Sequence, residues 1–376
     1  MPNPTVKPLL FLALSFPVFL AAAPAEPGTP AVFPGLAYPV EIKLPAGQKE
    51  GAVLYGTPFS LAPAQDYDTL LLQGEMPDPA VRIDIEVKSK VFFLPDPAYR
   101  QTGFRRFANG RFWARYKIGT AGRQPLRLVV VNLGLKTGST LTIYEGELAK
   151  GTSMREEREP RQDIPFAPGA ELSLPEDAPF TAVRRAQWQA APPREPFTPH
   201  APRYFTLHHT QAHYPKTYDA SVAEIQFIQD FHKNGRGWND IGYHFLIDPF
   251  GTIFEGRPLN AVGAHVKYRN TGNIGISFMG NHHPPVSNPI APETVNSFVT
   301  VGRYLKDTYS VDRSSFYAHR DIQSTDCPGD DLYARMEALR GLIFDPLPVP
   351  VLPDAAPAPT PAQSESLRGL LELLGR

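Results

Sequence analysis

The sequence predicts two domains of different class, a smaller all-β domain followed by an α/β domain in which helices cover a mixed central sheet. Three observations support this prediction. Hydrophobic and polar residues alternate through much of 38–149, which is the period of a half-buried strand. Strand-like and helix-like segments follow one another through 203–345, as they do when helices cover a sheet. Proline-rich segments at 26–37, 150–202 and 346–376 separate or flank the two regions and are expected to be linkers or a tail.

The overall composition excludes several classes of protein. The chain has 376 residues, and its 37 basic and 38 acidic residues give a net charge of -1. A protein that coats nucleic acid carries a strong basic excess, so no nucleic-acid partner is expected. A single cysteine excludes an internal disulfide. All ten histidines lie between His200 and His319, and Cys327 follows eight residues later. Metal or acid–base chemistry is therefore expected in the second half of the chain.

Residues 1–25 resemble an export signal. Lys7 gives a weakly positive start, residues 9–23 are mostly apolar, and small residues up to Ala25 offer cleavage positions. The apolar run is short for a membrane span of about 20 residues. We expect a secreted, periplasmic or cell-envelope protein with no stable membrane span after cleavage, and an uncleaved anchor is the less favoured alternative.

The first domain is expected over 38–149, as an antiparallel β domain without a helix of useful length. Asn109-Gly110 lies between two aromatic-rich runs and predicts a hairpin, because both residues tolerate positive φ. Alternation or apolar runs of strand length predict further strands at 40–44, 83–88, 126–131 and 141–144.

The second domain is expected over 203–345. Ser221 and Glu224 have the spacing of a capping box at the start of a helix, and Asn234-Gly235 would end it. Proline and glycine in 248–251 are placed as a type I turn prefers. Further strands are expected at 204–208, 243–247, 252–255, 273–279 and 316–318, and further helices at 292–309 and 331–342.

Cys327 and the histidines form a candidate metal site. Zinc accepts neutral imidazole and thiolate, and catalytic sites combine three protein ligands with one open position. Cys327 lies in a polar loop, and His319 directly follows the short strand at 316–318. The third ligand would come from His208 or His209 at the end of another strand. Adjacent strand residues point to opposite faces, so only one of the pair is expected to reach the metal, and the pattern does not choose.

The remaining histidines are interpreted as structural or solvent-facing. A solvated loop is expected around His282-His283, a linker position for His200 and a structural strand position for His244. The ligand-like spacing of His209 and His213 is discounted, because Pro215 argues against a helix that would align them.

Several motifs, in order, resemble the peptidoglycan recognition protein and type 2 amidase family, whose enzymes are zinc-dependent N-acetylmuramoyl-L-alanine amidases. The resemblance covers about 203–342 and not the first domain or the tail. The motifs are LHHT at 207–210, DIGYHF at 240–245, FEGR at 254–257, GISFMG at 275–280 and HRDIQSTDCPG at 319–329.

The resemblance implies a fold, a cofactor and a set of site residues. It implies an amidase domain that holds Zn²⁺ with His208, His319 and Cys327. It also implies that Tyr243 donates a hydrogen bond to the developing oxyanion and that Thr325, which stands where phage enzymes have a lysine, orients water or substrate. His265 and Asn270 are expected to bind substrate, and for His265 a role in proton relay is kept as an alternative.

The implied reaction is hydrolysis of the amide between N-acetylmuramic acid and L-alanine in peptidoglycan, a muropeptide substrate. A non-catalytic peptidoglycan-binding module is the main alternative, and a zinc hydrolase of another small amide is a third. The complete ligand set favours the enzyme.

Six cations with no acid between them suggest a role for the first domain. They are interleaved with aromatic residues, which would suit an anionic wall polymer or glycan. A hairpin with one solvated face and one aromatic core face explains the same pattern and is preferred. This basic stripe consists of Arg100, Arg105, Arg106, Arg111, Arg115 and Lys117.

Overall fold

The structure is a computed structural model that describes residues 31–88, 99–151, 174–176 and 178–345. The predicted signal at 1–25 and the predicted tail at 346–376 lie outside the described residues. Within the described ranges no helix has both the length and the apolar character needed to cross a membrane.

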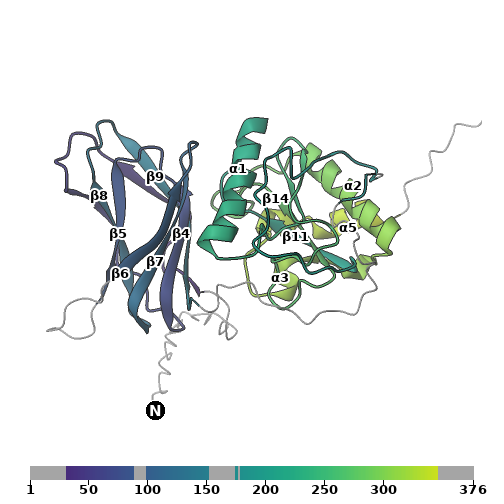
Figure 1. The fold of residues 1–376 in the computed structure, drawn as a ribbon, viewed down its shortest axis with the longest axis horizontal. Coiled ribbons are helices and arrows are strands. Elements are labelled where there is room, and N and C mark those ends of the chain that lie inside the picture. The colour runs from purple at the N-terminus through teal and green to yellow at the C-terminus, as the bar shows by residue number, and fades with distance from the viewer. Residues whose placement is uncertain (1–30, 89–98, 152–173, 177, 346–376) are drawn as a thin grey trace, which may run out of the picture.

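Residues 31–151 form two antiparallel sheets that pack face to face (Figure 1). All described elements in this range are strands. The larger sheet has the order β1-β9-β4-β7-β6, with β2 also paired to β9, and the smaller sheet has the order β3-β8-β5. The strands are β1 (Ala31–Val32), β2 (Val40–Leu44), β3 (Val53–Gly56), β4 (Tyr67–Glu75), β5 (Val81–Val87), β6 (Tyr99–Arg106), β7 (Arg111–Gly122), β8 (Leu126–Asn132) and β9 (Ser139–Ala149).

Period-two alternation explains how the two sheets meet. In β5, Ile83 and Ile85 are buried while Arg82 is exposed, and the buried residues share one core with Leu70 and Leu72 of β4. The predicted hairpin joins β6 to β7, with Gly110 at φ 86°. The domain begins earlier than expected, because β1 pairs with β9 and Phe33 is buried inside the predicted linker at 26–37.

The second domain is a six-stranded mixed sheet with the order β10-β13-β12-β14-β11-β15. Only the β12–β13 pair is antiparallel. The strands are β10 (Ala182–Val183), β11 (Tyr204–His209), β12 (Phe245–Ile247), β13 (Ile253–Glu255), β14 (Asn273–Phe278) and β15 (Phe316–Ala318). The helices are α1 (Tyr218–Asp230), the π-helix η1 (Phe231–Gly235), α2 (Pro292–Tyr309), the 3₁₀ helix η2 (Arg313–Ser315), α3 (His319–Ile322), α4 (Asp330–Tyr333) and α5 (Met336–Phe344).

The helix ends differ from the sequence pattern in two places. Helix α1 begins at Tyr218, because the Thr217 side chain accepts the Ala220 N–H at 3.1 Å, so Thr217 is the cap and Ser221 is not. The helix predicted at 331–342 is divided into α4 and α5. By contrast, α2 has the predicted bounds, with Pro292 at a first-turn position where its missing N–H has no cost.

The described part of the proline-rich segment 150–202 belongs to the second domain rather than to a linker. Strand β10 pairs with β13, and Trp188 is fully buried and donates its indole N–H to the Glu255 carbonyl at 2.8 Å. His200 is also buried, and its Nδ1 accepts the Gly272 N–H. Proline limits ladder hydrogen bonds without preventing irregular chain from packing on a sheet edge.

The two domains pack against each other through the larger sheet of the β domain and α1, which lies next to that sheet in Figure 1. Leu71, Trp113 and Ala149 point away from the β-domain core and share a hydrophobic cluster with Ile228 and Phe231. The larger sheet is therefore covered on both faces.

The interface also explains half of the basic stripe. Arg111 is fully buried and donates to the Glu224 carboxylate of α1 at 2.8 and 3.1 Å, while its guanidinium lies 3.9 Å from the Phe227 ring centroid. Arg105 pairs with Asp230, and Arg115 donates to the Gly235 carbonyl.

The aromatic core face of the preferred interpretation is present, because Phe112 and Tyr116 of the hairpin lie in the β-domain core. The solvated face differs from that interpretation in part. Three of its six cations contact the second domain, and of these Arg111 is fully buried while the Arg105 side chain stays 55% exposed. Of the others, Lys117 pairs with Asp68 and Arg106 donates to the Met76 carbonyl. The sequence pattern could not reveal this, because the acidic partners in α1 lie more than a hundred residues away.

Candidate metal centre

Three candidate ligands meet at one edge of the mixed sheet. His208 lies near the end of β11, His319 directly follows β15, and Cys327 lies in the loop before α4. Strands β11 and β15 are parallel neighbours, so the residues at their carboxyl ends reach the same edge. One potential ligand atom from each of the three residues lies within 4.8 Å of the other two.

The spacing of these atoms fits a single tetrahedral ion. Cys327 Sγ lies 3.5 Å from His208 Nδ1. One sulfur and one nitrogen bound to the same tetrahedral zinc at about 2.3 and 2.0 Å would lie about 3.5 Å apart. Two imidazoles and one thiolate form a known zinc set, and they leave one of four positions for water or substrate.

The hydrogen bonds of His208 leave the required nitrogen free. His265 Nε2 lies 3.1 Å from the Asn273 carbonyl, which can only accept, so this nitrogen carries a proton. His265 Nδ1 then accepts a hydrogen bond from His208 Nε2 at 3.0 Å. In neutral His208 the remaining lone pair is on Nδ1, the atom that faces Cys327. An outer hydrogen bond of this kind fixes the tautomer of a metal-binding histidine.

Two glycines make room for the His265 ring. A Cβ atom on Gly263 or on Gly275 would come within 2.6 Å of that ring. The close approach holds the ring in the plane that reaches both His208 and the Asn273 carbonyl.

The tautomer of His319 is also fixed by a hydrogen bond, in this case to a side chain. Its Nε2 lies 2.8 Å from Gln323 Oε1, four residues later and just beyond α3. An amide oxygen only accepts, so Nε2 donates and Nδ1 keeps the lone pair. The His319 and His208 ring centroids are 4.5 Å apart.

Burial keeps the metal-free site neutral. It lowers the pKa of His319 to about 4, and it lowers the pKa of His208 well below its usual range with help from the neighbouring His319 and His265. Burial also raises the pKa of the Cys327 thiol to about 12. The imidazoles are thus neutral, as ligands must be, whereas the thiol must lose a proton when a cation binds.

Tyr243 lies beside this group, with its ring centroid 5.2 Å from that of His208. Burial raises the pKa of Tyr243, so its hydroxyl stays protonated near neutral pH. The side chain is partly exposed and can meet a ligand from solvent.

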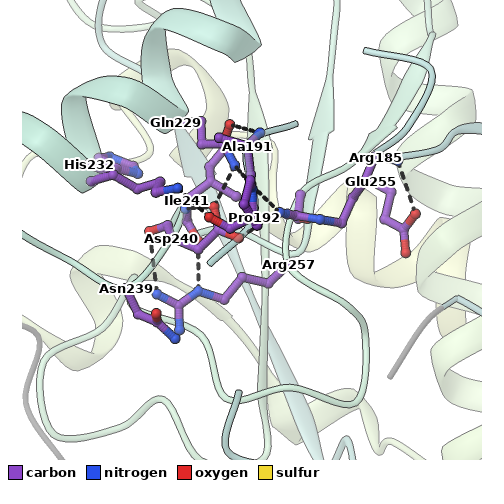
Figure 2. Close-up of polar contacts among 12 residues, drawn as sticks. Arg185, Ala191, Pro192, Gln229, His232, Asn239, Asp240, Ile241, Glu255 and Arg257 are labelled. Carbon is purple, nitrogen blue, oxygen red and sulfur yellow. Dashed lines mark hydrogen bonds and ion pairs between the residues drawn. The ribbon is translucent and has the colours of Figure 1, made fainter. Parts of the chain in front are cut away.

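The loop that leads to Tyr243 is fixed by Asp240, whose polar partners are drawn in Figure 2. The Asp240 carboxylate accepts from Arg185 and from Gln229, each at 2.6 Å. Arg257 donates to the Ile241 carbonyl at 2.7 Å from the other side. These contacts attach the loop to α1 and to the segment before β11. They therefore fix the position of the backbone just before Tyr243.

Two other predicted site residues stabilise loops. Thr325 Oγ1 accepts the Cys327 N–H at 3.2 Å and so supports the ligand loop. Asn270 is buried, and its Oδ1 accepts the N–H groups of His265 and Val266 at 2.8 and 2.9 Å. His265 is also buried, and it contacts His208 through its Nδ1.

The other histidines lie outside the group. His209 points to the opposite face of β11, where its Nδ1 accepts the His282 N–H. His282 is buried, so the expected solvated loop around it was wrong. His244 has the expected structural role, because its Nδ1 accepts the Gly275 N–H. His213 contacts Glu75 of the β domain.

Sequence reasoning named His265 as a site residue but missed its contact with His208, and it missed Gln323 altogether. Gln323 follows His319 by four residues, a spacing that brings side chains together on one helical turn and could have indicated the contact. The contact of His265 with His208 had no such signal, because the two residues are 57 positions apart.

Comparisons with known proteins indicate the family to which the second domain is related. The family described as N-acetylmuramoyl-L-alanine amidase matches residues 198–330. Peptidoglycan-recognition protein SC2 of Drosophila melanogaster is 37% identical over 134 residues, which cover 35% of this chain and 70% of that protein. Peptidoglycan recognition protein 1 of Bos indicus is 38% identical over 135 residues, 35% of this chain and 68% of that protein.

One solved structure from a bacterium is also similar. It is the N-acetylmuramoyl-L-alanine amidase LysC from Clostridium intestinale, which is 32% identical with a TM-score of 0.34, over 39% of this chain and 91% of that one. The relatives carry the assignment, since the match covers more than two thirds of their length at over 30% identity. The chain belongs to the peptidoglycan recognition protein and type 2 amidase family.

Proposed function

We propose that the chain is a zinc-dependent N-acetylmuramoyl-L-alanine amidase that hydrolyses the amide between N-acetylmuramic acid and L-alanine in peptidoglycan. The convergence of His208, His319 and Cys327, with an unprotonated Nδ1 on each imidazole, carries this proposal. Members of the family that lack a full ligand set would have no such group.

The donor set suits a Lewis-acidic zinc ion. Two neutral imidazoles and one thiolate would cancel only one of its two positive charges. When bound, zinc lowers the pKa of a water molecule to about 7 and polarises a carbonyl group, and both effects promote amide hydrolysis.

The protein residues around the ligands have separate tasks. The protonated Tyr243 hydroxyl donates a hydrogen bond to the negative charge that develops on the carbonyl oxygen. His265 holds His208 in the tautomer that leaves Nδ1 free, which makes it a positioning residue rather than a contact for substrate. Thr325 holds the Cys327 loop, and Asn270 holds the backbone that carries His265.

The test is incubation of the purified full chain with peptidoglycan, with and without a chelator, followed by end-group analysis. An amidase releases new L-alanine amino termini without new reducing sugar ends, and the chelator stops it. Cys327→Ala should lose zinc and activity together. His283→Ala is a matched control, because His283 lies outside the ligand group, and it should keep both.

The same experiment separates the alternative functions. Retention on peptidoglycan without new amino termini, from a chain that holds zinc, would indicate a binding module. Hydrolysis of small amides but not of peptidoglycan would indicate a different zinc hydrolase. Full activity in metal-free Cys327→Ala protein would refute the zinc mechanism.

A peptidoglycan substrate implies a position in the cell envelope or outside the cell. We therefore propose that residues 1–25 direct export, as their sequence pattern suggests. Fractionation of cells that produce the full chain tests this, and recovery of the uncleaved protein only from the cytoplasm would refute it.

A further inference from the structure

The loop between η1 and Tyr243 is held at its two ends by different domains. At the end near Tyr243, the Asp240 contacts of Figure 2 belong to the amidase domain. At the other end, Arg236 contacts the β domain. Its guanidinium pairs with Glu147 at 2.6 Å and with Glu145 at 3.1 Å, both on β9.

This ion pair is largely shielded from water. The side chain of Arg236 is 13% exposed and that of Glu147 is 5% exposed. The guanidinium also lies 5.1 Å from the Phe231 ring centroid and 5.2 Å from that of Trp238. A shielded and stacked arginine with two carboxylate partners has little freedom to move, unlike a surface ion pair.

Aromatic contacts continue from Arg236 to the site. The His232 ring centroid lies 4.6 Å from that of Trp238 and 5.7 Å from that of Tyr243. His232 Nδ1 accepts the N–H of Gly242, the residue before Tyr243, at 3.0 Å. Burial raises the pKa of Tyr243, and the charges of Arg236 and Glu145 act on this pKa with opposite signs, which agrees with their proximity.

The π-helix makes this arrangement possible. The Arg236 N–H bonds to the Phe231 carbonyl five residues earlier, at 2.9 Å, and this wide turn lets His232 face Tyr243 while Arg236 faces β9. Single π turns within helices occur frequently at functional sites.

We propose that Glu147 is a positioning residue for the amidase reaction, and that through Arg236 it fixes the loop that carries Tyr243. The β domain is then a structural part of the catalytic unit and not a tethered binding module. This inference rests on the proposed amidase function.

The rest of the interface allows Glu147 to be changed without separating the domains. Arg111 with Glu224, and Trp113 with Asp230, join the domains at other points, and the hydrophobic cluster around Leu71 lies between them. A variant at Glu147 should therefore loosen the loop while the domains stay together.

The test compares kinetics of full-chain variants at equal zinc content. Glu147→Gln should lower kcat at least about tenfold with little change in KM, because a small displacement of a reacting group has a large effect on rate. Glu147→Asp, which keeps the charge, should recover part of the loss. Glu86→Gln is the matched control, since Glu86 pairs with Arg127 on the other sheet, and it should leave kcat unchanged.

A second variant background separates positioning from general damage. In Tyr243→Phe protein the loss caused by Glu147→Gln should largely vanish, because the hydroxyl it positions is gone. The same loss in both backgrounds, or no loss in either, overturns the inference. Should Glu147→Gln fail to fold, the more exposed Glu145 serves, and Glu145→Gln should give a several-fold loss that also vanishes in Tyr243→Phe.

A readout without activity keeps the two proposals separate. If the wild-type chain releases no L-alanine termini, the proposed function fails, and amide hydrogen exchange then tests the positioning. In Glu147→Gln, exchange at 236–243 should be at least about tenfold faster, with no change in β14. Equal exchange at 236–243 in both proteins refutes the role of Glu147.

Discussion

The outer hydrogen bond of His208 gives a prediction about zinc affinity. His265→Met and His265→Gln replace the ring with flexible side chains of similar length. The Gln amide oxygen can accept from His208 Nε2, and its nitrogen can donate to the Asn273 carbonyl, as His265 does at 3.0 and 3.1 Å. Met can do neither, so the two variants differ in hydrogen bonding and little in size.

The expected magnitude follows from what the contact does. Loss of an outer partner of a metal-binding histidine weakens metal affinity about 10- to 100-fold, which corresponds to about 1.4 to 2.7 kcal/mol. We expect His265→Met to lie in this range. His265→Gln should stay within about threefold of the wild type, because it keeps the His208 tautomer in place.

The assay is competition for zinc between the full chain and a chromophoric chelator at neutral pH. Thermal unfolding of the metal-free proteins serves as a control, because equal midpoints exclude a general loss of fold. Equal zinc affinity in His265→Met and the wild type would refute the orienting role. Equally weakened zinc affinity in His265→Met and His265→Gln would show that packing of the ring against Gly263 and Gly275 matters instead.

Three further predictions concern Tyr243, the buried pair of Arg111 with Glu224, and His319. Tyr243→Phe should keep zinc and lose about 10²-fold in kcat, and loss of metal in this variant would contradict its assignment. Arg111→Met should lower the free energy of unfolding in urea by about 3–5 kcal/mol because it leaves Glu224 buried and unpaired, whereas adding Glu224→Met should recover most of this loss. In metal-free protein the pKa of His319 in the folded state, about 4, lies below its unfolded value of about 6.5. The contribution of neutral His319 to the free energy of unfolding is therefore fully present above pH 6.5 and is lost as the pH falls toward 4. The slope from this histidine is at most about 1.4 kcal/mol per pH unit, and stability that stays flat over this range would contradict the buried neutral state.

Local signals in the sequence predicted many of the elements. The proline at the start of 292–309 gave the helix its correct bounds, and Asn109-Gly110 gave the β6–β7 hairpin, because both depend on residues within a few positions. Thr217 was missed as the N-cap of α1 because Ser221 and Glu224 have the three-residue spacing of a capping box and were taken as the helix start. Glu224 instead serves a distant arginine, which no local pattern shows.

The site could be predicted in part for a similar reason. Strand alternation limited the choice between His208 and His209 to one residue, and the family resemblance implied His208. The partners that select tautomers, His265 and Gln323, depend on how loops fold back onto the ligands. The buried segment around Trp188 was mistaken for a linker because of its many prolines. Proline lacks a backbone N–H and so disfavours regular helices and strands, but this does not prevent a segment from packing in a core.

The π-helix has a consequence for insertions and deletions. In an α-helix each residue turns the chain by about 100°, so removing one residue from 231–235 would rotate everything that follows by about that angle. The imidazole that meets Gly242 and the guanidinium that meets β9 could then no longer reach their partners together. The length of this turn is therefore as important for these contacts as the identity of its residues. A one-residue insertion or deletion there would disturb the loop that carries Tyr243 and the contact with the β domain together.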